Sequence, residues 1–331
     1  MGPARPAVTT ISGKAIGPVG YGMLSLTKPW APIEYPMAAK VMKTALEQGA
    51  NLWNGGIHYG TPEANSLHLL RYYFEQYPED VNKIVLSIKG AFGARTGPDG
   101  SPEGIRASVD EAVKVLGGIK TIDIFELARV DPKVPIETSI GTLAELVKEG
   151  KIGGIGLSEV SANTIRKAHA VHPITGVEIE LSLFTPDPLH NGIVETCHEL
   201  GIPIIAYSPI SRGWLTGELR KLEDLPADDF RRMLPRFQPA VFDQNFKLVE
   251  AVQGIAKRKG KGVTTAQIAI GWVVAQGAIP IPGSARVERV VENTHPAVLT
   301  DADLVEIRTI LDTLPISGER YGGAHEKFLN A

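Results

Sequence analysis

Residues 121–159 read TIDIFELARVDPKVPIETSIGTLAELVKEGKIGGIGLSE, in which two short apolar runs flank an amphipathic stretch. The runs, at 121–128 and 152–159, are rich in β-branched residues, as buried strands are. The stretch 135–149 has a helical period and is followed by Gly150, a residue type favoured just after a helix C-terminus. The segment therefore predicts two parallel strands joined by a right-handed helical crossover.

The same alternation of strand and helix extends over most of the chain. We predict further helices at 36–48 and 64–76, and one that follows an N-cap at Ser101 and begins with Pro102. The strand candidates are eight short apolar runs, at 18–24, 50–56, 84–90, 121–128, 152–159, 176–183, 202–210 and 278–284. Parallel strands alternating with helices predict an α/β protein, and eight such units predict a barrel.

Segments outside the repeating units add to this barrel. Residues 8–17 predict a hairpin at its bottom, and 242–260 and 300–315 predict two extra helices. The long segment 211–262 has the size of a lid or binding loop. We therefore expect a (β/α)8 TIM barrel with an N-terminal β-hairpin and two extra helices, in which residues 1–331 form a single domain.

A doubly wound sheet is the competing architecture. It would normally carry a glycine-rich phosphate-binding turn after its first strand. The nearest candidate, GPVGYG at 17–22, has the wrong spacing, and its glycines precede the strand or lie within it. A barrel is therefore favoured, and its active site is expected at the carboxyl ends of the strands.

Composition restricts the function classes. A formal net charge of −3 gives no basic surface for nucleic acid, and no apolar run is long enough for a membrane helix. The N-terminal residues lack the apolar stretch of a secretory signal. A single cysteine, Cys197, allows no internal disulfide and fits a packed position in a reducing compartment. We expect a cytoplasmic protein that needs no protein partner.

Three polar residues follow predicted strands, where a barrel places its catalytic groups. They are Tyr59, Lys89 and Tyr207. In IVLSIK, Ser87 and Lys89 share one face, so the lysine is expected to point into the barrel mouth. A phenol within reach of that ammonium would have a lowered pKa and could donate a proton. Taken singly, each residue also fits an ordinary surface lysine or packed tyrosine.

Six segments together are similar to blocks of the aldo-keto reductase family, in the family's order. They are GANLWNGGIHYG (49–60), LSIKG (86–90), FELARVDPKVPIE (125–137), GLSE (156–159), IIAYSPISRGWLTG (204–217) and IPIPGSARVERVVEN (279–293). The resemblance implies NADPH/NADP+ bound without a Rossmann fold and hydride transfer to the carbonyl carbon of a small molecule. It also implies a tyrosine proton donor supported by lysine, aspartate and histidine.

The resemblance assigns roles to matching positions. Tyr59 matches the proton donor, Lys89 the residue that lowers its pKa, and Asn54 the position of the aspartate. On the cofactor side, Tyr207 matches the aromatic residue that stacks on the nicotinamide, and Ser158 matches a carboxamide ligand. The family's neighbouring asparagine and strand-six glutamine are replaced by Glu159 and Glu178. The loop after the seventh strand, which includes Trp214, is expected to cover the pyrophosphate; its cofactor residues are Ser208, Arg212, Gly213 and Leu215.

The last block resembles the family's clamp on the adenosine phosphate. Its residues are Ser284, Arg286, Arg289, Glu292 and Asn293. The two arginines are three positions apart, so they share a helix face and can fork onto a phosphate, which favours NADPH. A lysine of some family members is replaced by Gly283, which removes one phosphate contact.

Two departures from the family pattern concern catalysis. Asn54 brings no negative charge, so we expect Lys89 to lose its proton more easily. Ala128 replaces the family's histidine, which removes a hydrogen-bond donor and widens the pocket. Together these features are most similar to the fungal pyridoxal reductase branch. The expected substrate pocket contains Trp30, Trp53, His58 and Ala128.

Three functions remain open. The first is reduction of pyridoxal to pyridoxine or of a similar aromatic aldehyde, and the second is reduction of secondary-metabolite ketones or aldehydes. The third is a nicotinamide-binding sensor with little turnover, marked by Asn54 and Ala128. We expect no metal site, because His169 and His172 have the spacing of a ligand pair but no evident third ligand.

Overall fold

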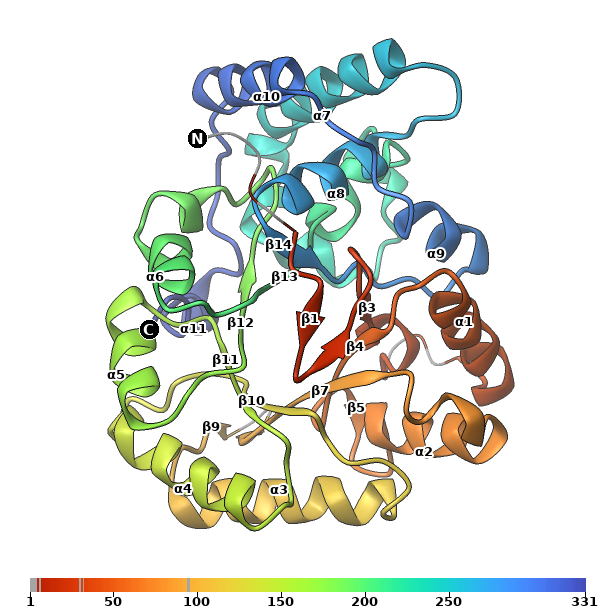
Figure 1. The fold of residues 1–331 in the computed structure, drawn as a ribbon. Coiled ribbons are helices and arrows are strands. Elements are labelled where there is room, and N and C mark those ends of the chain that lie inside the picture. Colours follow the sequence, from red (N-terminus) through yellow and green to blue (C-terminus); the bar gives the residue numbers. More distant parts are fainter. Residues whose placement is uncertain (1–4, 6, 30, 32, 94–95) are drawn as a thin grey trace.

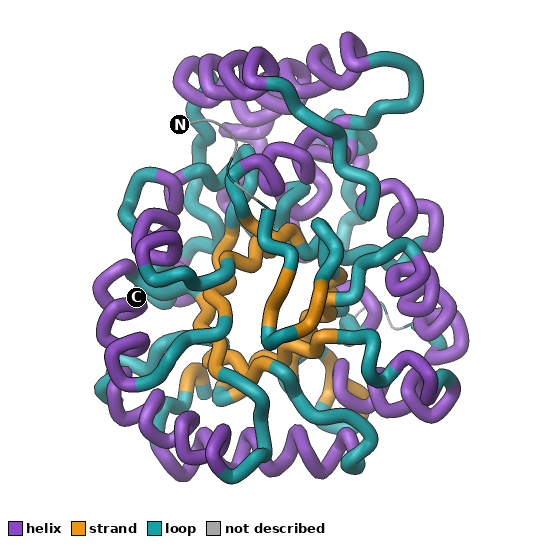
Figure 2. The backbone as a smooth tube through the Cα atoms, in the orientation of Figure 1, coloured by secondary structure: helices purple, strands orange, loops and turns teal. Residues whose placement is uncertain are grey.

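The computed structural model describes residues 5, 7–29, 31, 33–93 and 96–331. Its main sheet contains eight parallel strands in the order of the chain. They are β3 (Tyr21–Gly22), β4 (Leu52–Gly56), β7 (Val85–Gly90), β10 (Ile124–Leu127), β11 (Ile155–Ser158), β12 (Gly176–Glu180), β13 (Ile204–Tyr207) and β14 (Ala278–Pro280). Figure 2 shows them as a central ring inside a layer of helices. Each predicted strand is confirmed, and so is the barrel.

Glycines close the ring between its first and last strands. The Gly20 amide donates to the Pro280 carbonyl at 2.9 Å. A Cβ at Gly20 would lie 2.6 Å from the Leu52 carbonyl oxygen, and one at Gly22 would lie 2.7 Å from that of Ile281. These distances are too short for a side chain, so the 17–22 segment needs glycine for close backbone packing and not for a phosphate-binding turn.

The outer layer consists of the helices of the repeating units; the first four were predicted by their ranges, and the other four follow the predicted alternation of strand and helix. The helices of this layer are α1 (Tyr35–Glu47), α2 (Ser66–Gln76), α3 (Pro102–Leu116), α4 (Ile136–Lys148), α5 (Ala162–Val171), α6 (Ile193–Glu199), α8 (Thr265–Ala275) and α9 (Val287–Asn293). At α3 the Ser101 hydroxyl accepts a hydrogen bond from the Gly104 amide, and Gly117 ends the helix in the left-handed region with φ of 64°. The predicted cap is thus confirmed.

The additions to the barrel are also confirmed. The two extra helices, α7 (Pro239–Lys259) and α10 (Asp301–Thr313), lie together at the top of Figure 1. A short helix, α11 (Gly323–Glu326), precedes the C-terminus. Short 3-10 helices occupy the loops, at Leu24–Leu26, Pro78–Asp80, Asp187–Leu189, Ser211–Thr216, Leu222–Asp224, Phe230–Met233 and Pro235–Phe237. Two-residue strands form the hairpins β5 (Gly60–Thr61) with β6 (Ala64–Asn65) and β8 (Phe92–Gly93) with β9 (Gly97–Pro98).

The N-terminal hairpin closes one end of the barrel. It consists of β1 (Thr10–Ile11) and β2 (Lys14–Ala15), and β1 lies over the centre of the ring in Figure 1. Ile11 is buried in one cluster with Leu52, Val85 and Ile124, the first residues of their strands. The hairpin therefore blocks the amino ends of the strands, and the carboxyl ends remain for the site.

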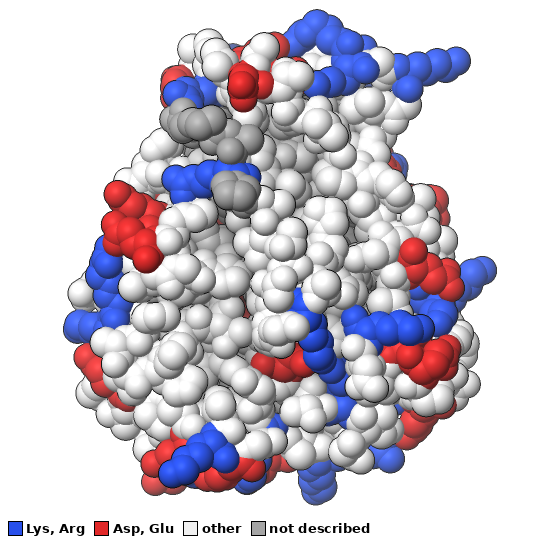
Figure 3. Space-filling model, viewed as in Figure 1, with Lys and Arg blue, Asp and Glu red and all other residues white. Residues whose placement is uncertain are grey.

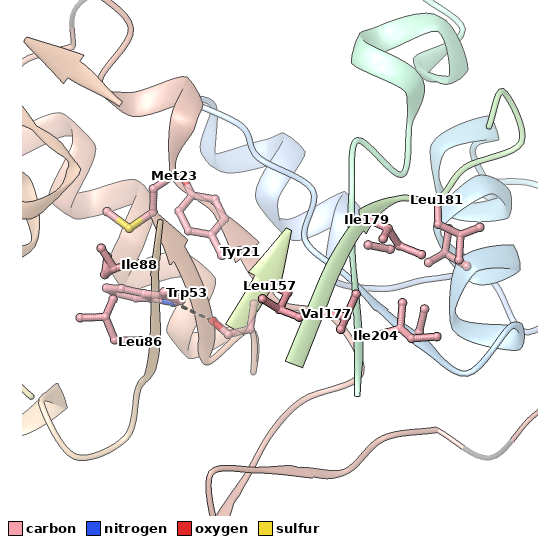
Figure 4. Close-up of a cluster of buried hydrophobic side chains, with 14 of the residues drawn as sticks. Tyr21, Met23, Trp53, Leu86, Ile88, Leu157, Val177, Ile179, Leu181 and Ile204 are labelled. Atoms are coloured by element: carbon pink, nitrogen blue, oxygen red, sulfur yellow. Dashed lines mark hydrogen bonds between the residues drawn. The ribbon is translucent and has the colours of Figure 1, made fainter. Parts of the chain in front are cut away.

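Alternate residues of each strand face the helices. Trp53 on β4 is completely buried in this outer core, where its ring packs edge-on against Tyr73. Its indole N–H donates to the Ala50 carbonyl at 2.8 Å, and Figure 4 shows Leu86 and Ile88 beside it. The prediction that Trp53 lines the substrate pocket is therefore wrong. Because strand side chains alternate, Trp53 points outward and its neighbour Asn54 points inward.

The molecular surface has charges of both signs. On the face in Figure 3, lysines and arginines are interspersed with acidic residues around the outline, and uncharged atoms fill most of the centre. None of the helices that the structure describes combines the length and apolarity that a membrane span requires. Cys197 is buried in α6, as expected, and burial raises the pKa of its thiol to about 12.

Candidate active site

A cavity of about 1160 Å³ contains most of the predicted site residues. Those that line it are Asn54, His58, Tyr59, Lys89, Ala128, Glu178, Tyr207, Ser208, Arg212, Gly213, Ser284, Arg286, Arg289, Glu292 and Asn293. They come from strand ends and from the loops that follow, as the barrel predicts.

Lys89 lies at the base of this cavity, on β7, and is only 3% exposed. Its Nζ donates to Asn54 Oδ1 at 2.9 Å and to Glu178 Oε2 at 2.5 Å. Asn54 is on the adjacent strand β4, whereas Glu178 comes from β12. The side-chain amide of Asn54 in turn donates to Glu178 Oε2 at 2.6 Å. The ammonium, the amide and the carboxylate therefore form one buried hydrogen-bonded group.

Glu126 on β10 belongs to the same group and was missed by the sequence reasoning. Its Oε1 accepts from Asn54 Nδ2 at 2.9 Å and from the Ser87 hydroxyl. Its Oε2 lies 3.8 Å from Lys89 Nζ and is buried without a hydrogen-bond partner among the described residues. Alternation in IFEL could have identified it, because Ile124 faces the barrel interior and Glu126 is two residues further along.

These carboxylates reverse one prediction about Lys89. Burial lowers the pKa of Lys89, but the negative charges of Glu126 and Glu178 outweigh it and raise the pKa well above its usual range. The expectation that Lys89 loses its proton more easily because Asn54 is uncharged is therefore wrong. The negative charge absent from β4 is supplied across the barrel by β12 and β10.

The two glutamates share this single buried cation. Burial raises the pKa of Glu178 to about 8, as does the nearby Glu126, while Lys89 opposes the shift. A buried group with one ammonium and one ionised carboxylate is neutral, whereas a second ionised carboxylate would leave a net negative charge. Near neutral pH, Glu178 therefore holds a proton in much of the population.

Replacing Glu178 with glutamine is expected to change how stability depends on pH. The folded wild type keeps this proton up to about pH 8, whereas the unfolded chain releases it near 4.5. Between these values the folded state binds more protons, so the wild-type free energy of unfolding falls as pH rises. The variant should lack this fall, which for one proton is at most about 1.4 kcal/mol per pH unit. Urea unfolding across the interval measures it; an unchanged slope, or the same change in an exposed control, Glu199→Gln, would contradict the assignment.

Tyr59 faces the cavity just beyond β4, with Lys89 Nζ 5.7 Å from the centre of its ring. Burial raises the pKa of Tyr59 above its ordinary value; the charge of Lys89 opposes this, and Glu178 and Glu126 add to it. The predicted lowering of this pKa is therefore wrong in its net direction. The phenol keeps its proton at neutral pH, as a proton donor must.

At one side of the cavity the C-terminal segment contacts the predicted cofactor residues. The Tyr207 and Tyr321 hydroxyls are 3.2 Å apart, and the Arg212 guanidinium lies over the Tyr321 ring at 4.4 Å. Glu159 is completely buried and pairs with Arg320. Glu159 thus fixes the C-terminal segment, and the sequence reasoning did not identify Arg320 or Tyr321.

The predicted phosphate clamp lines the same cavity, in the segment after β14. Arg286 and Arg289 both pair with Glu218, a residue of the long loop after β13. Arg289 also pairs with Glu292. The Ser284 carbonyl accepts a hydrogen bond from the Tyr21 hydroxyl at 2.7 Å. This bond fixes the start of the clamp segment against β3. The predicted common face of the two arginines is confirmed, and the loop closes against it.

Other predicted site residues are not placed in the cavity lining. Leu215 is completely buried in the outer core, so its side chain does not reach the cavity, and its assignment to the cofactor stays a prediction. Ser158 is buried beneath the lining, where its hydroxyl accepts a hydrogen bond from Arg129 Nη1 at 3.3 Å. Trp30 lies outside the described residues.

The histidines have different environments. His58 lines the cavity beside Tyr59, and its pKa is lowered to about 3 by burial and by the charges of Lys89 and Arg129. Its ring is therefore neutral. His169 Nδ1 accepts the Ile174 amide at 3.2 Å. No group of three or more potential metal ligands occurs in the part of the chain that the structure describes.

Comparison with known proteins identifies the family. The family model "Aldo/keto reductase family" matches residues 18–312. The chain belongs to the aldo-keto reductase family. It is an oxidoreductase of that family, and the family acts on small-molecule carbonyl substrates with nicotinamide cofactors.

Two fungal proteins and one solved structure resemble this aldo-keto reductase over nearly its whole length. A Schizosaccharomyces pombe protein named "Probable pyridoxal reductase 2" is 41% identical, covering 97% of this chain and 99% of its own. A Saccharomyces cerevisiae protein, also named provisionally as a pyridoxal reductase, is 39% identical over 91% of this chain and 95% of its own. A glycerol dehydrogenase structure from Gluconobacter oxydans, at 23% identity, has a TM-score of 0.82 and covers 97% and 99%, which supports the fold.

Proposed function

We propose that this reductase uses NADPH to reduce pyridoxal, or a similar aromatic aldehyde, with Tyr59 as the proton donor. The observation that carries the proposal is the placement of Tyr59 above the buried Lys89 group in a cavity that also contains two clamp arginines. The names of the two fungal relatives support pyridoxal as the substrate. The proposal extends to residues 1–331 acting as one domain in the cytoplasm.

The residues that line the cavity fit NADPH. At the clamp, Arg286 and Arg289 already bind one carboxylate, that of Glu218, and the same forked donors suit a phosphate. Beside them, Glu292 Oε1 is buried without a partner among the described residues and can accept a donor from a ligand. At the end of the adjacent strand β13, the aromatic ring of Tyr207 offers a stacking surface in the same cavity. When bound, NADPH supplies the hydride.

The protein's own residues then transfer one proton to the substrate. Tyr59 holds it on its hydroxyl and releases it to the oxygen of the reduced carbonyl. The phenolate that remains is stabilised by the Lys89 ammonium, whose charge Glu178 and Glu126 maintain. Asn54 keeps that ammonium in place through its hydrogen bond of 2.9 Å. The Lys89 ammonium therefore acts as a fixed positive charge beneath the donor.

A substrate panel tests the proposed function. Purified protein is mixed with NADPH and with pyridoxal, 4-nitrobenzaldehyde, an aromatic ketone or no carbonyl, and NADPH oxidation is followed by absorbance. We expect turnover with the aldehydes and the highest kcat/KM with pyridoxal. Faster turnover of another carbonyl compound would contradict the assignment of pyridoxal as the substrate. Tight NADPH binding without turnover on the whole panel would reject the enzyme and support the sensor.

Replacing Arg289 with alanine is expected to weaken NADPH binding about 10- to 100-fold, and NADH binding much less. The expected loss is that of one charge-assisted hydrogen bond to the 2′-phosphate, about 1.5–3 kcal/mol. Dissociation constants for both cofactors, from quenching of protein fluorescence, measure it. The control is Arg258→Ala on α7, where the exposed arginine pairs with Glu306. Equal losses for the two cofactors would rule out the phosphate contact.

A further inference from the structure

Arg129 lies at the carboxyl end of β10, next to Ala128, and lines the same cavity as Tyr59. It lies in the position after the one where the family carries its histidine. Its Nη1 donates to the Ala128 carbonyl and, at 3.3 Å, to the Ser158 hydroxyl. These acceptors are neutral, and they hold the guanidinium at the edge of the cavity. The hydrogen bonds among the described residues leave Nε and Nη2 free to donate.

Arg129 differs from the other arginines of the cavity. Each of those forms an ion pair: Arg212 with Glu180, Arg231 with Asp229, and both Arg286 and Arg289 with Glu218. None of the ion pairs among the described residues includes Arg129. The nearby Glu159 acts on Arg129 only from beyond ion-pair distance, and its carboxylate is paired with Arg320. A partly buried guanidinium without a carboxylate at ion-pair distance is a ready site for an anionic group of a ligand.

The surroundings of Arg129 place that site at the reacting end of the cavity. The charges of Arg129 and Lys89 both act on His58, which stacks edge-on against Tyr59 at 4.8 Å between ring centres. The neutral, small side chain of Ala128 leaves space beside the guanidinium. The clamp arginines belong to the segment after β14, whereas Arg129 follows β10. A cofactor phosphate bound at the clamp is therefore not the anion that would pair with Arg129.

We propose that Arg129 binds an ionised oxygen that the substrate carries next to its carbonyl, and so selects aromatic aldehydes with an ionised ortho-hydroxyl group. The proposal rests on the proposed reductase function and names the substrate class of that site. A forked donor holding the ortho oxygen fixes the ring while the carbonyl oxygen faces Tyr59. Arg129 would thus orient the substrate in place of the histidine donor that is absent at Ala128.

The test compares two aldehydes that differ in one group. In 2-hydroxy-5-nitrobenzaldehyde the nitro group makes the phenol ionise at neutral pH, whereas 2-methoxy-5-nitrobenzaldehyde stays neutral. With saturating NADPH, Arg129→Met should lower kcat/KM for the hydroxy aldehyde about 10- to 100-fold, mostly through KM, and leave the methoxy aldehyde nearly unchanged. Arg129→Lys should recover part of the loss. The control is Arg166→Met, an exposed arginine that pairs with Glu199 on the outer surface.

Several outcomes would overturn the proposal. Equal losses for both aldehydes would make Arg129 a structural or general catalytic residue, and no loss for either would remove it from substrate binding. A parallel loss of NADPH affinity would assign it to the cofactor. If the wild type reduces neither aldehyde, the proposed function fails separately. Arg129 is then tested by calorimetry with 2-hydroxy-5-nitrobenzyl alcohol and the protein–NADP+ complex, where the wild type should bind at least about tenfold tighter than Arg129→Met.

Discussion

Replacing Tyr59 with phenylalanine is expected to lower kcat about 100- to 10,000-fold, the usual contribution of a positioned general acid. The ring and its contact with His58 remain, so the cavity should keep its shape. The dissociation constant for NADPH should therefore stay nearly constant. Steady-state kinetics with the best aldehyde of the panel, together with fluorescence titration of NADPH, separate the two effects.

The matched control is Tyr72→Phe. Tyr72 lies on α2, where its ring packs against Tyr35 outside the cavity. This variant should keep wild-type kinetics. Full activity of Tyr59→Phe would show that another group donates the proton, and His58 would be the first residue to examine because it lies beside Tyr59.

Replacing Lys89 with methionine is expected to lower the free energy of unfolding by about 3–5 kcal/mol. The reason is that Glu178 and Glu126, each 1% exposed, would lose the one cation that compensates the negative charge of this buried pair. Turnover should also fall strongly, because Tyr59 loses its neighbouring ammonium. Urea denaturation followed by circular dichroism gives the change in stability.

A double-mutant cycle isolates the charge effect. Glu178→Gln removes one buried carboxyl, so Lys89→Met should cost less stability in that background than in the wild type. The cycle also covers the case in which Lys89→Met alone is too unstable to purify, because the double variant should fold. A loss below about 1 kcal/mol for Lys89→Met, or an equal loss in both backgrounds, would contradict the arrangement.

The fold could be predicted because its signals are local. The period of two in 84–90 gives both the strand and the inward direction of Lys89, and the caps at Ser101 and Gly150 mark helix ends in the sequence itself. The clamp was found for the same reason, since Arg286 and Arg289 are separated by almost one helical turn. Features of this kind depend on neighbours along the chain.

The charges around Lys89 could not be predicted in the same way. Asn54 suggested an uncompensated ammonium, but the compensating carboxylates come from strands that begin about 70 and 120 residues later. Their distances depend on how the barrel places its inward side chains. Tyr321 illustrates the same point, because its contact with Tyr207 spans 114 positions and follows no local pattern.

The close backbone contact of Gly20 and Gly22 with the segment of β14 has a consequence for how the chain folds. The hydrogen bond from Gly20 to Pro280 joins residues 260 positions apart, so it carries a large loop-closure entropy. During synthesis β3 emerges long before β14, and until then β3 and β13 are open edges of an incomplete sheet. Completion of this barrel is therefore expected to be a late event, and both strand edges stay open to pairing with other chains until β14 is available.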